Sequence, residues 1–351
     1  MAYTTIDKGS LHFNTTLYTG TAATNAQTGI GFQPDWVWIQ NRGGTYANVV
    51  FDVVRGTTKL LEPNNGSAEN TVSDTLTSFD SDGFTLGADS SNYCNRSSSP
   101  NTYAAWNWRA GGGQGSSNTD GSINTTYTSV NTTSGFSIST YTGTGSAATI
   151  GHGLGATPDY IIVKNRSDSG ESWMVWNNVL AANKYLLLNT TGAEATDTTI
   201  WNNTLPTSSV FSIGTHDTVN KSGSNYVAYC FTNIKGFSKV GSYTGNGGTD
   251  GPFVYTGFKP AWVMIKASSR STDNWLILDN KRSTYNPANN GLFPNNASSA
   301  EGTGYKRDFL SNGFKVRESG ANQNGSGHTF TYIAFAEEPL VSSNNIPATA
   351  R

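Results

Sequence analysis

Three aromatic residues in polar stretches of the sequence have the chemistry of carbohydrate recognition. Tyr93, Trp201 and Tyr285 each lie in a segment rich in Asn, Ser and Thr. An aromatic ring can stack on the apolar face of a sugar while neighbouring amides bond to the sugar hydroxyls. The sequence therefore nominates these three as candidate ligand-binding residues. Rings that hold loops against the body of a β-protein would give the same pattern, and this simpler interpretation stays open.

Two acid–base pairs recur along the chain and raise the question of glycoside hydrolysis. Asp52 and Arg55 are matched by Asp279 and Arg282, whereas the corresponding stretch in the middle of the chain has neither charge. A glycosidase needs two carboxylates that face each other in one cleft, and no second carboxylate can be assigned to either pair. We interpret each pair as a local salt bridge or turn cap on the surface. We expect no enzymatic activity and no catalytic residue.

The sequence has no metal-binding or nucleophile motif. The 4 histidines form neither HExxH nor another spaced pair, and no GxSxG turn is present. The 2 cysteines, Cys94 and Cys230, are too few for a disulfide scaffold, so we predict free thiols. We predict no metal and no cofactor.

Three stretches of the chain have nearly the same sequence, and each begins with Gly-x-x-Pro. They are GFQPDWVWIQNR (Gly31–Arg42), GATPDYIIVKNR (Gly155–Arg166) and GFKPAWVMIKA (Gly257–Ala267). Each is preceded by Tyr-Thr-Gly and followed, in one order, by a second apolar strand, a polar loop, a turn with a strand and a closing strand. Such repeats indicate one supersecondary unit copied within the chain. The closing strands that this alignment predicts are Tyr103–Trp108, Tyr226–Phe231 and Tyr332–Glu337.

The repeats predict an all-β protein with three tandem, related, antiparallel β-sandwich modules. We place module 1 at residues 1–110, module 2 at 125–235 and module 3 at 236–339, with a Gly/Ser-rich linker at 111–124 and a C-terminal tail at 340–351. Because Gly/Ser-rich segments are flexible in isolation, we expect a loose first junction, and a stiff second one. Three lobes around a common axis are the alternative to a rod.

The repeated strand is apolar on both of its faces. Val37 and Ile39 point to one face, where the other two copies also have β-branched residues. We expect this column to lie in the core of each module. Trp36 and Trp38 point to the other face, which a loop, a neighbouring module or another subunit must cover. The best helical candidate is a short segment at residues 178–184.

The composition argues against two classes of partner. Charged residues make up 13% of the chain, with 22 Lys and Arg against 24 Asp and Glu. A typical soluble protein has about 25%. Such a surface has little long-range field and no basic cluster, so we expect no nucleic-acid partner and no membrane insertion. The N-terminal residues lack the apolar segment of a signal peptide, and we expect synthesis in a cytoplasm.

Segments spread over nearly the whole chain resemble a group of poorly characterised structural proteins of marine tailed phages, cyanophages and pelagiphages among them. They include TTIDKGSLHFNTTLYTG (Thr4–Gly20), WNWRAGGGQGSSNTDGSINT (Trp106–Thr125), DFLSNGFKVR (Asp308–Arg317) and AFAEEPLVSSNNIPATAR (Ala334–Arg351). The resemblance implies a virion component with jelly-roll or concanavalin-like β domains. It carries over no catalytic residue.

The leading hypothesis is a non-enzymatic virion structural protein at the particle surface, as a tail appendage or fibre, a knob or a capsid decoration. A glycan-binding protein for host recognition is the alternative, and a polysaccharide depolymerase is the third hypothesis. The expected partners are other virion proteins, further copies of the chain in a homo-oligomer, and a host surface glycan. The expected location is the virion, after synthesis in the host cytoplasm.

Overall fold

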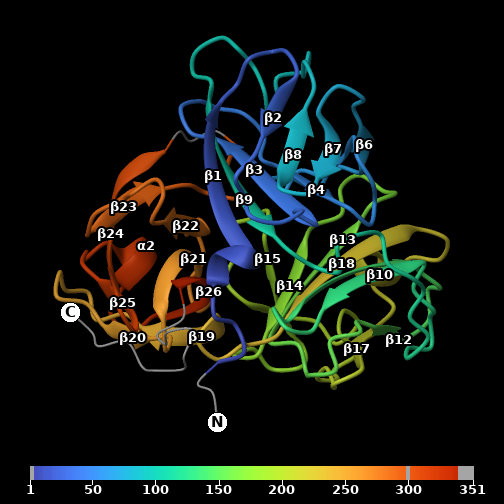
Figure 1. Cartoon of the computed structure of the whole chain (residues 1–351). Helices are drawn as coiled ribbons and strands as arrows, with labels where there is room; N and C mark the ends of the chain where they lie inside the picture. Colours follow the sequence, from blue (N-terminus) through green and yellow to red (C-terminus); the bar gives the residue numbers. More distant parts are fainter. Residues whose placement is uncertain (1–3, 298–300, 339–351) are drawn as a thin grey trace.

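A computed structural model describes residues 4–297 and 301–338, and these residues form almost entirely antiparallel β-sheets (Figure 1). The predicted all-β class is confirmed. The helical segments in the described part are short: η1 (Gly9–Leu11), α1 (Asp217–Asn220) and α2 (Ala321–Asn324). No helix there is long and apolar enough to cross a bilayer. The predicted tail at residues 340–351 lies outside the described residues.

The helix expected at residues 178–184 is wrong. The Leu180 N–H donates to the Asn177 carbonyl and the Lys184 N–H to the Ala181 carbonyl, so the segment makes two consecutive tight turns. These short-range bonds replace the continuous ladder of an α-helix, and Lys184 already begins a strand.

The same order of strands recurs in three sheets. In each sheet the strand that ends in Tyr-Thr pairs with the closing strand, which pairs with the Gly-x-x-Pro strand, which pairs with the second apolar strand. In the first sheet these are β1 (Phe13–Thr19), β9 (Thr102–Trp108), β3 (Trp36–Asn41) and β4 (Val49–Asp52). In the second they are β11 (Phe136–Thr142), β18 (Asn225–Phe231), β13 (Tyr160–Asn165) and β14 (Met174–Asn177). In the third they are β19 (Ser238–Thr244), β26 (Thr329–Glu338), β21 (Lys259–Ala267) and β22 (Leu276–Asp279).

Smaller sheets accompany these three. The second sheet is extended by β10 (Tyr127–Asn131) at one edge and by β15 (Lys184–Leu187) and β16 (Ala195–Thr196) at the other. The other strands are β2 (Asn25–Gln27), β8 (Gly83–Leu86), β7 (Leu76–Asp80), β5 (Lys59–Leu60) and β6 (Asn70–Thr71); β12 (Ala148–Gly151) and β17 (Val210–Ile213); β20 (Phe253–Tyr255), β25 (Gly313–Val316), β24 (Gly302–Leu310) and β23 (Ala288–Gly291). Each sheet uses strands of one predicted module.

The β-branched face of the repeated strand is buried inside its own module. Val37 and Ile39 pack with Phe51, Phe84 and Leu86 in a cluster whose residues all belong to module 1. The corresponding residues of the other modules are also buried: Ile161, Val163, Val263 and Ile265. The prediction that this column lies in the core of its own module is confirmed for module 1; in modules 2 and 3 the column is buried in a larger cluster that spans the modules.

The other face of the repeated strand is covered by the neighbouring modules. Trp36 stacks on Tyr229 of module 2, with ring centroids 4.6 Å apart, and Trp108 lies 5.5 Å from Trp262 of module 3. Phe231 and Phe335 join modules 2 and 3 at 5.6 Å. We call this aromatic centre the hub. The three lobes therefore surround one common centre, as Figure 1 shows, and the remaining void there is about 10 Å³.

The closing strand of module 3 is shifted by two residues from the predicted alignment. Tyr103 pairs with Tyr18 and Tyr226 pairs with Tyr141, but Tyr243 pairs with Phe330 rather than with Tyr332. The reason is that the conserved feature of the three pairs is a ring stacked on the tyrosine, and Phe330 supplies that ring at 5.0 Å. The predicted alignment matched Tyr332 to Tyr103 and Tyr226 by residue type, and this match gave the wrong register.

The Gly/Ser-rich linker is tied to both adjoining modules, in contrast to the loose junction that we expected. The Asp35 carboxylate of module 1 accepts the N–H groups of Ala110 and Gly112 at 2.6 and 2.9 Å. Further along, Ser116 forms a bridge with Thr128 of module 2. A Cβ at Gly115 would lie 1.9 Å from the Thr128 carbonyl oxygen. The glycine there therefore permits close backbone approach.

Candidate functional site

The structure does not bring the three predicted ligand-binding residues together, since each belongs to a different module. Trp201 is 3% exposed and lies in the core of module 2. Tyr93 is half-buried, packs against the module 1 cluster, and its N–H donates to Asp89. The loop-anchoring interpretation therefore describes these two rings. Tyr285, at 86% exposure, is the one of the three that presents its ring to solvent.

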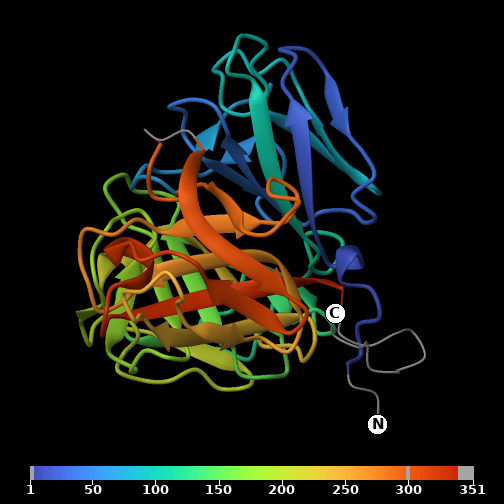
Figure 2. The same ribbon diagram turned by 90° about the vertical axis from the view of Figure 1, so that its left-hand side faces the viewer.

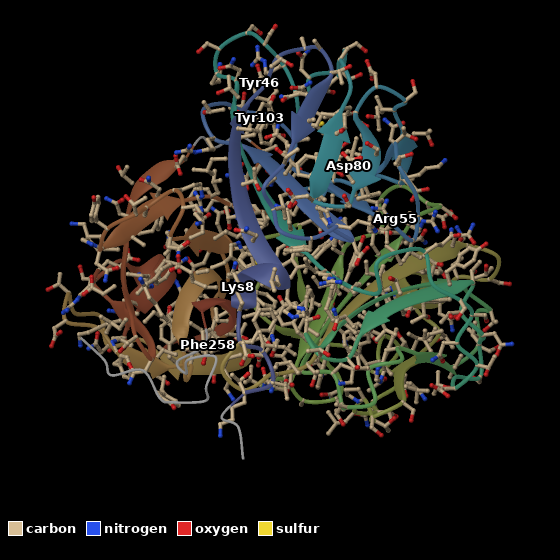
Figure 3. All side chains as sticks on the ribbon, viewed as in Figure 1. Lys8, Tyr46, Arg55, Asp80, Tyr103 and Phe258 are labelled. Atoms are coloured by element: carbon tan, nitrogen blue, oxygen red, sulfur yellow. The ribbon has the colours of Figure 1, made fainter. Side chains whose placement is uncertain are left out.

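The first acid–base pair is a buried joint between modules 1 and 2. Asp52 Oδ2 accepts from Arg55 Nε at 2.5 Å, and Asp52 Oδ1 accepts the Arg55 backbone N–H at 2.8 Å. The predicted salt bridge and turn cap are thus both present. The surface location is wrong, because neither side chain has exposed area. The Tyr229 hydroxyl of module 2 also donates to Asp52 Oδ2, at 2.7 Å. Figure 3 shows Arg55 where the strands of module 1 meet module 2.

The second pair repeats this joint between modules 3 and 1. Asp279 Oδ2 accepts from Arg282 Nε at 2.6 Å and from the Trp106 indole of module 1 at 3.0 Å. Register places Trp106, Tyr229 and Ile333 at the same position of their closing strands. In module 2, where the pair is missing, the facing residue of module 3 is therefore apolar. Module 2 has Asn177 in place of the accepting aspartate, and module 3 has Ile333 in place of the donating Tyr or Trp.

A glutamate after the second strand bridges each module to the next. Glu69 accepts two hydrogen bonds from Arg166 of module 2, at 2.8 and 2.9 Å, and one from Arg55 of its own module at 3.1 Å. Burial raises the pKa of Glu69, but the hydrogen bonds from Arg166 and the charge of Arg55 outweigh burial and hold the pKa below its usual value. The carboxylate therefore works in its ionised form.

The backbone contact of this glutamate closes a ring of three modules. Its N–H donates each time to a carbonyl just after the repeated strand of the next module, and the pairs are Glu69 to Arg166, Glu194 to Ser268 and Glu301 to Arg42. The last pair returns from module 3 to module 1. Head-to-tail contacts of this kind form closed rings when the rotation closes, and here one chain supplies all three members.

Buried amines occupy the same position in two of the repeats. Lys164 Nζ donates to the Gly66 carbonyl of module 1 at 3.3 Å, and Lys266 Nζ donates to the Thr191 carbonyl of module 2 at 3.2 Å. Gln40 takes this position in module 1 and reaches module 3. Burial lowers the pKa of each lysine to about 8. Perturbed lysines can be catalytic, but these are enclosed by backbone carbonyls and serve the joints.

Both cysteines are free and buried, as predicted. Burial raises the pKa of each thiol, which keeps it in the unreactive protonated form. Within residues 4–297 and 301–338, His, Cys, Asp and Glu side chains form no group of three or more suited to a metal ion.

Exposed aromatic rings concentrate on module 3, the side that Figure 2 turns toward the viewer. Phe253, Tyr255 and Tyr285 belong to it. Beside them a groove of about 500 Å³ is lined by Lys259, Asn286, Phe309, Leu310, Ser311 and Asn312. Sequence reasoning missed Phe253 and Tyr255 because it searched polar loops, and these two lie on a strand. A comparison of the three repeats at this strand would have found them.

A family model described as "Domain of unknown function (DUF7483)" matches residues 8–339, which cover all three modules. A search of curated proteins finds no match. The extent of the match indicates that the complete three-lobed unit, rather than one module, is what the family shares.

Proposed function

The chain belongs to the DUF7483 family, and we propose that it is a non-enzymatic structural protein displayed at the surface of a phage particle. A tail appendage or fibre, a knob and a capsid decoration all fit this role. The resemblance of its segments to structural proteins of marine tailed phages supports the proposal. Its partners are then other virion proteins and further copies of the chain.

The observation that carries the proposal is the closed ring of modules. The backbone bonds of Glu69 and Glu194 connect module 1 to module 2 and module 2 to module 3. The bond from Glu301 to Arg42 connects module 3 back to module 1, so each module takes part in two of these contacts. The hydrogen bonds to the buried carboxylates of Asp52 and Asp279 and the aromatic hub connect the same modules. A closed block of this kind suits a surface component, because the contacts between its modules are completed within one chain.

The experiment is to purify the particles that encode this chain and measure their proteins by quantitative mass spectrometry. We expect the chain at a fixed number of copies per particle, and gold-labelled antibodies against it should bind intact particles. Repeated absence from purified particles, with other structural proteins detected, would contradict the proposal.

Recognition of a host glycan is the second candidate function, and one specific observation favours it. Phe253, Tyr255 and Tyr285 expose their rings on one module beside a groove that also has amide and hydroxyl groups. Rings beside hydrogen-bonding groups are the chemistry that holds sugars.

A further inference from the structure

We propose that module 3 binds a polysaccharide on a platform formed by Phe253 and Tyr255 and continued by the groove beside Tyr285. This inference deepens the second candidate function above, and its biological setting depends on display at a particle surface. Phe253 is 44% exposed and Tyr255 is 61% exposed, while Val254 between them is buried. Because side chains alternate along a strand, the two rings point to the same outer face of β20, about 7 Å apart.

The other two modules show that the fold does not need these rings. The strand register identifies the corresponding residues in the other modules. The pair of Val254 with Phe314 in module 3 corresponds to two pairs elsewhere: Gln27 with Phe84 in module 1 and Ile150 with Phe211 in module 2. The residues that correspond to Phe253 are therefore Ala26 and Thr149, and those that correspond to Tyr255 are Thr28 and Gly151. Small residues thus suffice twice in the same strand. Neighbouring exposed apolar side chains are a feature of surfaces that contact another molecule.

Among the described residues no strand pairs with the outer edge of β20, whereas the linker covers the corresponding edge in module 2. In module 2 the linker lies along β12, with Ile123 bridged to Ile150 and hydrogen-bonded to Thr149. β20 is an edge strand of its sheet and its pairing partner is β25.

The platform and the groove are joined by the turn between β24 and β25. The Asn312 carbonyl accepts the N–H of Thr256, the residue after Tyr255, at 3.0 Å, and Asn312 itself lines the groove. At the far side, Asn286 binds both the N–H and the carbonyl of Phe309, each at 2.9 Å. These two bonds fix the loop that presents Tyr285. The platform and the groove therefore meet at Asn312.

The charges near the platform favour a sugar over an anionic polymer. Lys315, which lies opposite Phe253, pairs with Asp250 at 3.0 Å. Arg317 pairs with Asp308 at 2.5 Å and with the same Asp250 at 3.2 Å. Binding of single-stranded nucleic acid needs aromatic stacking together with unpaired positive charge along a groove. The cations here are neutralised by neighbours, so stacking and hydroxyl recognition remain.

The test uses the full chain and immobilised dextran, mannan, galactan and β-1,3-glucan, with binding measured by biolayer interferometry. The variant Phe253→Ala/Tyr255→Thr installs the residues that module 1 has at these positions, so it should fold normally. We expect binding of at least one polysaccharide by the native chain and a loss of about tenfold or more in the variant. Tyr285→Ala should also weaken binding. Tyr127→Ala, which removes an exposed ring from module 2, should leave it unchanged.

Three results would overturn the inference: no polysaccharide binds, the double variant binds as well as the native chain, or the platform instead binds a dT20 oligonucleotide or phosphatidylglycerol vesicles. An unchanged melting temperature confirms that the variant is folded. None of these results affects detection of the chain in purified particles, so the platform and the particle-surface role fail separately.

Discussion

Glu69 accepts hydrogen bonds from guanidinium groups of two modules, so removal of its charge should destabilise the contact between them. Arg166 is hydrogen-bonded to it twice, and Arg55, which has no exposed area, once. A cation left buried without its partner is more costly than the intact pair is stabilising. The joint is therefore fragile to loss of one charge.

Glu69→Gln should lower the free energy of unfolding by about 2 kcal/mol, because Arg166 loses its anion and Arg55 keeps only Asp52. Since the folded pKa of Glu69 is depressed, its contribution is complete above the unfolded pKa of about 4.3 and is lost as pH falls through the lower folded pKa. Urea denaturation at pH 7 and pH 3 measures both effects.

Glu337→Gln is the matched control, because Glu337 forms a 3.8 Å, partly exposed ion pair with Lys259. Pairs of that kind contribute about 0–1 kcal/mol. Equal losses in the two variants would refute the joint as described.

Lys164→Gln should remove a pH dependence on the alkaline side. The folded pKa of Lys164 is lowered to about 8, so between pH 8 and the unfolded value the unfolded chain binds more protons. This lysine therefore adds stability as pH rises, on the order of 3 kcal/mol in total. Glutamine keeps a donor, as Gln40 does in module 1.

The measurement is the difference between native and Lys164→Gln unfolding free energies from pH 7 to 9.5. Working with the difference cancels the thiols and tyrosines, which titrate in the unfolded chain of both proteins. If the difference in unfolding free energy does not change with pH, the pKa of Lys164 is not lowered in the folded protein, and the proposed effect of burial is wrong.

At the scale of elements, an aspartate at the start of the repeated strand holds the segment that follows the closing strand of its module. Asp35 binds the N–H groups of Ala110 and Gly112, and Asp159 likewise binds the N–H of Asn233 at 2.6 Å. Ala261 takes this position in module 3. The aspartate clamp is therefore present in modules 1 and 2.

Asp35→Ala should release the start of the linker. The buried N–H of Ala110 and the N–H of the exposed Gly112 lose their acceptor, at a cost of about 1–3 kcal/mol. Hydrogen exchange at residues 110–116 should accelerate, and limited proteolysis should cut within 111–124. Asp159→Ala should affect residues 232–234 instead, and Ala261→Asp neither site. Unchanged exchange in the Asp35 variant would mean that other contacts hold the linker.

The repeated strand also separates what sequence could predict from what it could not. Period-two alternation made the burial of Val37 and Ile39 predictable. It could not reveal that Trp36 meets Tyr229, because that contact depends on how three modules turn toward one another. Likewise the linker's composition indicated flexibility, whereas the acceptor on Asp35 that fixes it lies far away in the sequence. The platform residue Phe253 was visible only by comparison with Ala26 and Thr149.

At the scale of the whole molecule, the hub makes the three modules dependent on one another for stability. Trp108 contacts Trp262 at 5.5 Å, Phe335 at 5.7 Å and Phe231 at 6.5 Å, so one side chain touches both other modules. A module separated from the ring would expose this face to water. The free energy of each module therefore includes a large term shared with its neighbours.

We expect the full chain to unfold in one cooperative transition, with equal calorimetric and van't Hoff enthalpies. Leu86→Ala, in the cluster confined to module 1, should cost about 2–5 kcal/mol and move the whole transition to lower temperature without dividing it. Trp108→Ala removes the shared contacts as well, so it should broaden or divide the transition. Differential scanning calorimetry distinguishes these outcomes. If Leu86→Ala instead releases a separate early transition, module 1 melts alone, and the ring joins three independent bodies rather than one.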